Sequence, residues 1–107
     1  MNMQEKAYYL HSYLPKGRKN AVTIESLKRS TGFSRRAITD CMKYLRKEGI
    51  PVCSCNSEPG GYFIAASVED VLDYITRLTV IAKGITQNIA DMNTILLDMV
   101  GDGDVFE

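Results

Sequence analysis

Tryptophan is absent from the 107-residue chain, and histidine occurs once, at His11. With no second imidazole available, His11 is interpreted as a surface or partly buried residue rather than a metal ligand. The sequence also lacks a glycine-rich phosphate loop, a serine nucleophile elbow, and a Cys/His pair with supporting spacing. The pattern of residues therefore does not predict an enzyme.

Long hydrophobic runs are absent too. No apolar segment is long enough to span a bilayer, and the first ten residues, MNMQEKAYYL, contain no apolar core of a signal peptide. Three cysteines cannot all pair within the chain, which fits a reducing compartment. We therefore expect a cytoplasmic protein that makes no membrane contact.

The cysteines are the remaining candidates for a metal site. Cys53 and Cys55 share one face of a predicted strand, and with Cys41 and His11 they offer four potential zinc ligands. Their spacing matches no familiar zinc module, and Cys41 falls on an apolar stripe, so reduced cysteines in a core are the favoured interpretation. The segment 102–104, DGD, lacks the remaining ligands of a calcium loop. No metal, cofactor or small-molecule ligand is predicted.

The segment from Thr23 to Lys47 predicts two short helices joined by a tight turn. Thr23 and Ser34 suit the N-cap positions, because their hydroxyls can accept from a free backbone N–H. Gly32 suits the left-handed residue that ends a helix. The second helix has one apolar face and one polar, mostly cationic face, the pattern of a helix-turn-helix. The apolar residues are Ile38, Cys41, Met42 and Leu45, and the opposite face carries Arg35, Arg36, Thr39, Lys43, Arg46 and Lys47.

The net charge of zero conceals two oppositely charged halves. Residues 1–50 contain eleven Lys and Arg against four acids, a charge of +7, whereas residues 51–107 contain two against nine, a charge of −7. Such asymmetry indicates a polyanionic partner for the basic half. The alternative is a solvated basic surface without a partner, and the placement of the charges on the outer helix face favours the first interpretation.

Further elements flank this motif. Residues 3–14 predict a first helix stopped by Pro15, and residues 21–22 a short strand. Residues 51–55 and 61–65 alternate around the turn-forming NSEPG, which predicts a β-hairpin directly after the second helix of the motif.

The run SRRAITDCMKYLRKEGIPV, followed by GGYFIA, resembles the winged helix-turn-helix domains of small bacterial and phage DNA-binding proteins. The resemblance covers residues 3–66, about three-fifths of the chain. It implies DNA binding, with the helix from Arg35 in the major groove and the hairpin tip, near Asn56 and Ser57, against the backbone or minor groove. That tip has no Lys or Arg and one acid, a departure from a strongly DNA-binding wing.

Individual roles follow from side-chain chemistry. Arg35 and Arg36 lie in the first turn of the recognition helix, where arginine commonly reads guanine. Asp40 can accept from cytosine or pair with Lys43 or Arg36. The loop 15–21, PKGRKNA, lies over the phosphate backbone or is simply solvated. The predicted DNA-binding set is Ser34, Arg35, Arg36, Thr39, Asp40, Lys43, Lys28, Arg29, Lys16, Arg18, Lys19, Asn56 and Ser57, of which Ser34, Lys28 and Arg29 are assigned to phosphates.

Residues 67–100 predict one long helix with Ser67 as its N-cap, and residues 101–107 a flexible acidic tail. The apolar residues of this long helix are spaced alternately four and three apart, as in a coiled coil. We call this set the seam; it consists of Val71, Ile75, Leu78, Ala82, Ile85, Ile89, Met92, Leu96 and Met99. A homodimer through the seam is expected, in parallel or antiparallel orientation. The alternative is a helix that folds back on residues 1–66.

The expected fold is therefore mainly α with a small β-hairpin: a winged helix-turn-helix domain in residues 1–66 followed by a long, coiled-coil-like helix. The expected function is homodimeric, sequence-specific binding of double-stranded DNA by a transcriptional regulator. Two alternatives stay open. One is a phage-type accessory, adaptor or inhibitor protein that uses the same scaffold for protein–protein contacts. The other is a replication or recombination accessory that binds DNA for assembly.

Overall fold

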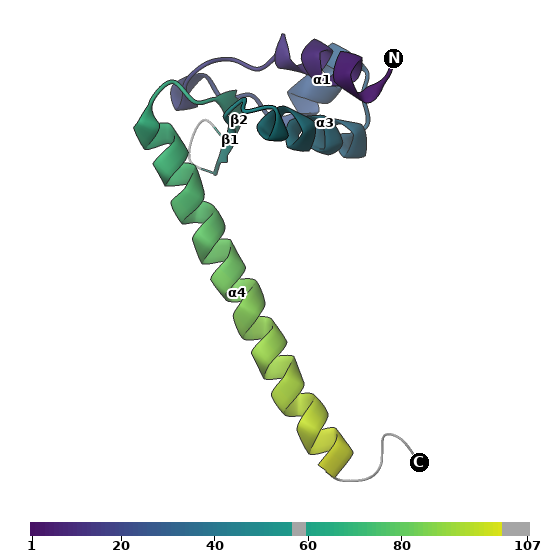
Figure 1. The fold of residues 1–107 in the computed structure, drawn as a ribbon, viewed down its shortest axis with the longest axis vertical. Helices are drawn as coiled ribbons and strands as arrows, with labels where there is room; N and C mark the ends of the chain where they lie inside the picture. Colours follow the sequence, from purple (N-terminus) through teal and green to yellow (C-terminus); the bar gives the residue numbers. More distant parts are fainter. Residues whose placement is uncertain (57–59, 102–107) are drawn as a thin grey trace. The chain divides into compact units, whose positions relative to one another are not determined.

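The computed structural model describes residues 1–56 and 60–101 (Figure 1). The protein is mainly helical, with one two-stranded antiparallel hairpin and a long C-terminal helix, which confirms the expected fold class. In chain order the elements are α1 (Met3–His11), the short 3-10 helix η1 (Arg18–Asn20), α2 (Ile24–Thr31), α3 (Arg35–Lys47), β1 (Val52–Cys55), β2 (Gly61–Ile64) and α4 (Val68–Gly101).

The helix boundaries of the motif lie where the side chains predict them. The hydroxyls of Thr23, Ser34 and Ser67 each accept from the backbone N–H three residues on, at 3.1, 3.2 and 3.2 Å. These bonds satisfy donors that a helix start otherwise leaves free, and they confirm the three expected N-caps. Gly32 ends α2 at φ +76°, the left-handed conformation that glycine adopts without steric cost.

The first helix is shorter than predicted. It ends at His11 rather than at Leu14, and the N–H groups of Tyr13 and Leu14 bond to the carbonyls of Leu10 and His11, three residues back. The residue before a proline is disfavoured in the α region, so Pro15 shortens the helix ahead of itself. Leu14 is nevertheless buried, because the tight turn directs it into the core.

The core lies between the three short helices and the first strand. α1 packs chiefly on α3, and α2 closes the remaining side. The apolar face predicted for α3 is buried in full, with no residue of it more than 2% exposed. The buried cluster comprises Ala7, Leu10, Leu14, Leu27, Ile38, Cys41, Met42, Leu45 and Val52.

The hairpin is joined to the helical motif through β2. β1 and β2 pair in the register Val52↔Ile64 to Cys55↔Gly61, and the far edge of β2 bridges to Val22. Gly61 lies at this junction with φ +128°, and a Cβ there would overlap the carbonyl oxygen of Val22. Only glycine therefore allows the strand to approach the segment before α2 so closely.

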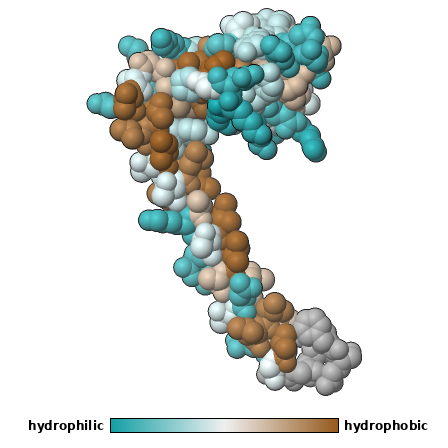
Figure 2. Space-filling view, in the orientation of Figure 1, coloured by the Kyte–Doolittle hydropathy of each residue, from teal (hydrophilic) through white to brown (hydrophobic). Residues whose placement is uncertain are grey.

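The chain divides into two compact units, Met1–Tyr74 and Ile75–Glu107. The division falls within α4, because its first two turns belong to the N-terminal unit, where Asp73 is paired with Arg18 at 3.8 Å. We call residues 75–101 the α4 extension. Apart from Arg77, each of its residues is exposed, and apolar side chains run along it (Figure 2). Among the described residues, no helix combines the length and apolar character needed to cross a bilayer.

Candidate nucleic-acid interface

The outer face of α3 carries a row of exposed cations. Because Ile38 and Leu45 are fully buried, the opposite side of the helix points to solvent, where Arg36, Lys43 and Lys47 are all exposed. Their spacing of seven and four residues places them on one line about 16 Å long at 1.5 Å per residue. An α-helix with its side chains is about 10–12 Å in diameter, so α3 has the size of an element that fits the major groove, which is about 12 Å wide.

Arg35 lies at the edge of this row and is held by an acid from α2. Its Nη2 donates to Oε1 of Glu25 at 3.3 Å, and Lys28 lies 3.6 Å from the other oxygen of Glu25. All three side chains are substantially exposed, so the pairs are screened by water and contribute little to stability. Their effect is on position, since Glu25 draws the Arg35 guanidinium toward α2.

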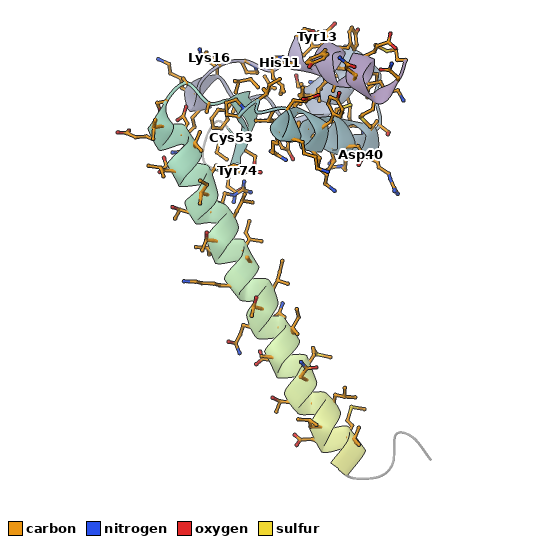
Figure 3. The ribbon with its side chains drawn as sticks, in the orientation of Figure 1. His11, Tyr13, Lys16, Asp40, Cys53 and Tyr74 are labelled. Atoms are coloured by element: carbon orange, nitrogen blue, oxygen red, sulfur yellow. The ribbon has the colours of Figure 1, made fainter. Side chains whose placement is uncertain are left out.

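Two further predicted residues make hydrogen bonds within the helix itself, and a third is half-buried. The Ser34 hydroxyl caps α3, and the Thr39 hydroxyl donates to the carbonyl of Arg35 at 3.0 Å. Asp40 is half-buried on α3, one residue from Thr39 (Figure 3). Ser34 and Thr39 remain exposed, so both can still meet a ligand.

The basic loop contributes exposed cations of two kinds. Lys16 and Lys19 are exposed, and the backbone at Lys16 bridges in parallel to Ile64 of β2. Arg18 is ion-paired with Asp73. The loop is thus anchored to the sheet while its lysines face solvent, and Arg29 on α2 is likewise exposed.

The hairpin tip is only partly described. Asn56 is exposed at the end of β1. The predicted contact at Ser57 lies outside the described residues.

Arg46 differs from the rest of the polar face predicted for α3. Its Nε donates to the carbonyl of Val52 at 2.8 Å, and its guanidinium carbon lies 5.4 Å from the centre of the Tyr74 ring. A hollow of about 240 Å³ beside it is lined by Cys53 and Val71, among others, and Figure 3 labels Cys53 and Tyr74 there. Arg46 therefore links α3, β1 and the start of α4 through a carbonyl bond and a cation–π contact, and does not belong to the outer row.

No family model, characterised protein or solved structure matches the chain.

Two residues of the interface were not in the predicted DNA-binding set. Lys47 continues the row of Arg36 and Lys43, and its position four residues after Lys43 is a signal that the periodicity of α3 already contained. Glu25 carried no comparable signal. Its ion pair with Arg35 joins two helices, and residues ten apart in sequence are brought together only by the angle between α2 and α3.

The cysteines belong to the packing of the N-terminal unit. Cys41 and Cys53 are buried, and burial raises the pKa of each thiol above its ordinary value of 9.0. Cys55 is half-buried. Within the part of the chain that the structure describes, no three His, Cys, Asp or Glu side chains are grouped so that they could hold a metal ion.

The seam predicted for self-association differs between its first residue and the others. Val71 is half-buried within the N-terminal unit, whereas the seam residues from Ile75 to Met99 are exposed. The large members are 43% to 62% exposed. These large residues are Ile75, Leu78, Ile85, Ile89, Met92, Leu96 and Met99. Ala82 is the one small residue of the seam.

Proposed function

We propose that this chain is a homodimeric, sequence-specific double-stranded DNA-binding protein that acts in the cytoplasm as a transcriptional regulator. Residues 1–66 are its winged helix-turn-helix domain, and α3 is its recognition helix. The observation that carries the proposal is the exposed row Arg36, Lys43 and Lys47 on a helix whose other face is fully buried.

The row combines two kinds of DNA contact. Arg36, in the first turn of α3, is suited to bidentate hydrogen bonds with guanine O6 and N7. Lys43 and Lys47 carry compact charges that suit phosphates, which position the protein without reading sequence. The exposed lysines of the loop, Lys16 and Lys19, extend the cationic surface beyond α3.

The charge distribution along the chain also favours DNA as the partner. The acids of the chain lie mostly after residue 50, and the basic half has a charge of +7. On α2 and α3, Glu25 offsets part of that charge beside Arg35, but within the described residues no salt bridge joins an acid to Arg36, Lys43 or Lys47. A polyanion meeting this face releases counterions, so affinity is expected to fall steeply with salt.

The first experiment measures binding to random duplex DNA by fluorescence anisotropy at several salt concentrations, followed by selection of a preferred site. Arg36→Ala is expected to weaken specific binding by about 1–3 kcal/mol and to relax base preference at one position. Lys47→Ala is expected to weaken binding to all sequences and to lower the salt slope by about 1.

Gln4→Ala, on the exposed side of α1, serves as the control and is expected to leave both quantities unchanged. Unaltered affinity and unaltered base preference in Arg36→Ala and Lys47→Ala would remove α3 as the DNA-reading element. A wild-type protein that binds no duplex even at low salt would overturn the proposal as a whole.

A second candidate function is favoured by a different observation. The α4 extension exposes an apolar face longer than most monomeric proteins tolerate, and such faces mark protein–protein contacts. An adaptor or inhibitor that engages a different protein through this helix would use it without DNA. That function predicts a heteromeric complex and no affinity of the purified chain for itself or for duplex DNA.

A further inference from the structure

The α4 extension is helical although its residues favour helix only weakly. Seventeen of the 27 residues from 75 to 101 are β-branched, Asn, Asp or Gly, and Gly84 lies near the middle. Few side-chain pairs compensate: Gln87 donates to Asp91 at 2.9 Å, one turn on. In proteins most helix stability comes from packing of an apolar face, so this helix needs a partner surface.

The exposed apolar area suits a second helix of the same kind. Ten large apolar residues of the seam and its flanks, between positions 75 and 100, are 43% to 62% exposed. At roughly 60 Å² of exposed side chain each, they present on the order of 600 Å² per chain. A standard interface buries about 800 Å² per partner, so one matching helix covers the face.

We infer that the occupant of this face is a second copy of the chain, and that the two α4 helices pair antiparallel. The inference rests on the proposed homodimer and adds its orientation, which the seam spacing alone leaves open. Two observations choose the orientation: the order of charges along the extension, and the place of its one small seam residue.

The charges of the extension are separated along its length. Arg77 and Lys83 lie in its first half, and Asp91 and Asp98 in its second half. Parallel copies would put each of these residues level with its own copy, so that cations lie beside cations and acids beside acids. With Ala82 opposite Ile85 of the second copy, an antiparallel pair instead sets Arg77 next to Asp91 of that copy. Antiparallel helices also align their macrodipoles favourably. The order of the charges and the helix macrodipoles both favour antiparallel pairing.

Ala82 is the second observation. In a parallel pair each seam residue faces its own copy, so Ala82 would meet Ala82 and leave a thin layer near the middle of the contact. In an antiparallel pair each layer joins two different seam positions. With Ala82 opposite Ile85 of the second copy, the same register sets Ile75 against Met92 and Ile89 against Leu78, so small meets large and no layer is empty.

This orientation determines how the DNA-binding units are spaced. In the register just described, residue 74 of one copy lies opposite residue 93 of the other. The two N-terminal units are then attached about 28 Å apart along the helix pair, at 1.5 Å per residue. The register of the two α4 helices therefore sets the distance between the two points of attachment.

The test uses distances between spin labels in the full-length chain. Cys55→Ser removes the half-buried thiol, and a single cysteine is introduced at Thr94 or at Gln87. The two positions are seven residues apart and point the same way, on the side of the helix away from the seam. Antiparallel pairing separates the two Thr94 labels by about 32 Å along the axis and the two Gln87 labels by about 10 Å.

The expected result is a dimer by sedimentation and an inter-label distance at Thr94→Cys longer than at Gln87→Cys by roughly 15 Å, given the rise of α4. Equal distances at the two sites would overturn the antiparallel inference and leave the homodimer standing. A monomer, or a mass above the dimer, would overturn the paired arrangement itself. DNA binding by a monomer would still be measured separately by anisotropy, so the two failures are distinguishable.

Discussion

The two units of this chain differ in whether the apolar face of an amphipathic helix is buried. α3 and the α4 extension are both amphipathic, but the apolar face of α3 is buried to the last residue, whereas no residue of α4 is fully buried. The eleven buried hydrophobic residues that the structure describes all lie before Tyr74. An apolar stripe therefore identifies a helix face that has to pack against other apolar side chains. Those side chains can belong to the same chain or to a second one.

The contrast extends to how the helices are stabilised. α2 and α3 are short, with caps at Thr23 and Ser34 and a glycine end at Gly32, and each packs against other elements of the N-terminal unit. α4 has 34 residues and one cap bond from Ser67 at its start. Caps contribute about 1 kcal/mol each and cannot hold so long a helix by themselves, so its stability has to come from association.

A charge in the seam should give the largest effect. Ile85→Glu introduces a carboxylate at the centre of the proposed contact in both copies, and an unpaired buried charge is strongly unfavourable. We expect self-association to weaken more than a hundredfold and helical circular dichroism to fall. Gln87→Glu, two residues on and away from the seam, is the matched control. If the Ile85→Glu protein keeps the wild-type mass, the seam is not the contact.

The next largest effect should be found within the N-terminal unit. Gly61→Ala places a Cβ against the carbonyl of Val22 and strains a residue at φ +128°, so the free energy of unfolding should fall by about 2–4 kcal/mol. Gly32→Ala, at φ +76° with no atom within 4 Å of the new Cβ, should cost only about 1–2 kcal/mol. Denaturant unfolding of both variants measures the difference. Equal losses would contradict a close approach at Gly61.

Thiol reactivity compares the two units directly. Burial raises the pKa of Cys41 and Cys53, so at pH 8 less of each is thiolate than at an ordinary thiol, and access is blocked as well. A cysteine introduced at Gln87 should react with an aromatic disulfide reagent more than tenfold faster than either. Cys41 and Cys53 should gain reactivity only at higher pH, or on unfolding. Rapid modification of both at pH 8 would show an open N-terminal unit.

The smallest effect concerns the ion pair between Glu25 and Arg35, at the edge of the proposed recognition face. Glu25→Gln removes the acid beside Arg35 and Lys28, and exposed pairs of this kind contribute between about 0 and 1 kcal/mol to stability. Unfolding should hardly change, while affinity for random duplex DNA should rise a few-fold, because one negative charge leaves the basic face. Ser30→Ala, exposed on α2, is the control. Weaker binding of random DNA by Glu25→Gln would contradict a purely repulsive contribution of Glu25.

Much of the fold was predictable because its signals are local. The helix periods, the caps at Thr23, Ser34 and Ser67, and the turn at Gly32 depend on residues within one or two turns of one another. The end of α1 was wrong by three residues, since the conformational restriction that Pro15 imposes on Leu14 acts before the proline itself. Leu10 and Leu14 are both buried, although only Leu10 lies within α1.

The candidate site was predictable in outline and not in detail. The outer face of α3 followed from its 3.6-residue period, which placed Arg36 and Lys43 together. The same period put Arg46 on the polar face, yet its side chain turns to Val52 and Tyr74, because a carbonyl and an aromatic ring from other elements lie within its reach. A long side chain can reach groups on several elements, and which of those groups lie within its reach depends on the tertiary structure.

By itself the sequence determined the main helices and the hairpin, the caps at Thr23, Ser34 and Ser67, the two oppositely charged halves and the spacing of the seam, because each of these depends on neighbours along the chain. The tertiary structure alone decided three features: the pairing of Arg35 with Glu25, the inward turn of Arg46, and the requirement for glycine at Gly61. Each depends on the distance between elements that are separate in sequence. That distance is set by how the apolar faces pack together, and local propensity carries no information about it.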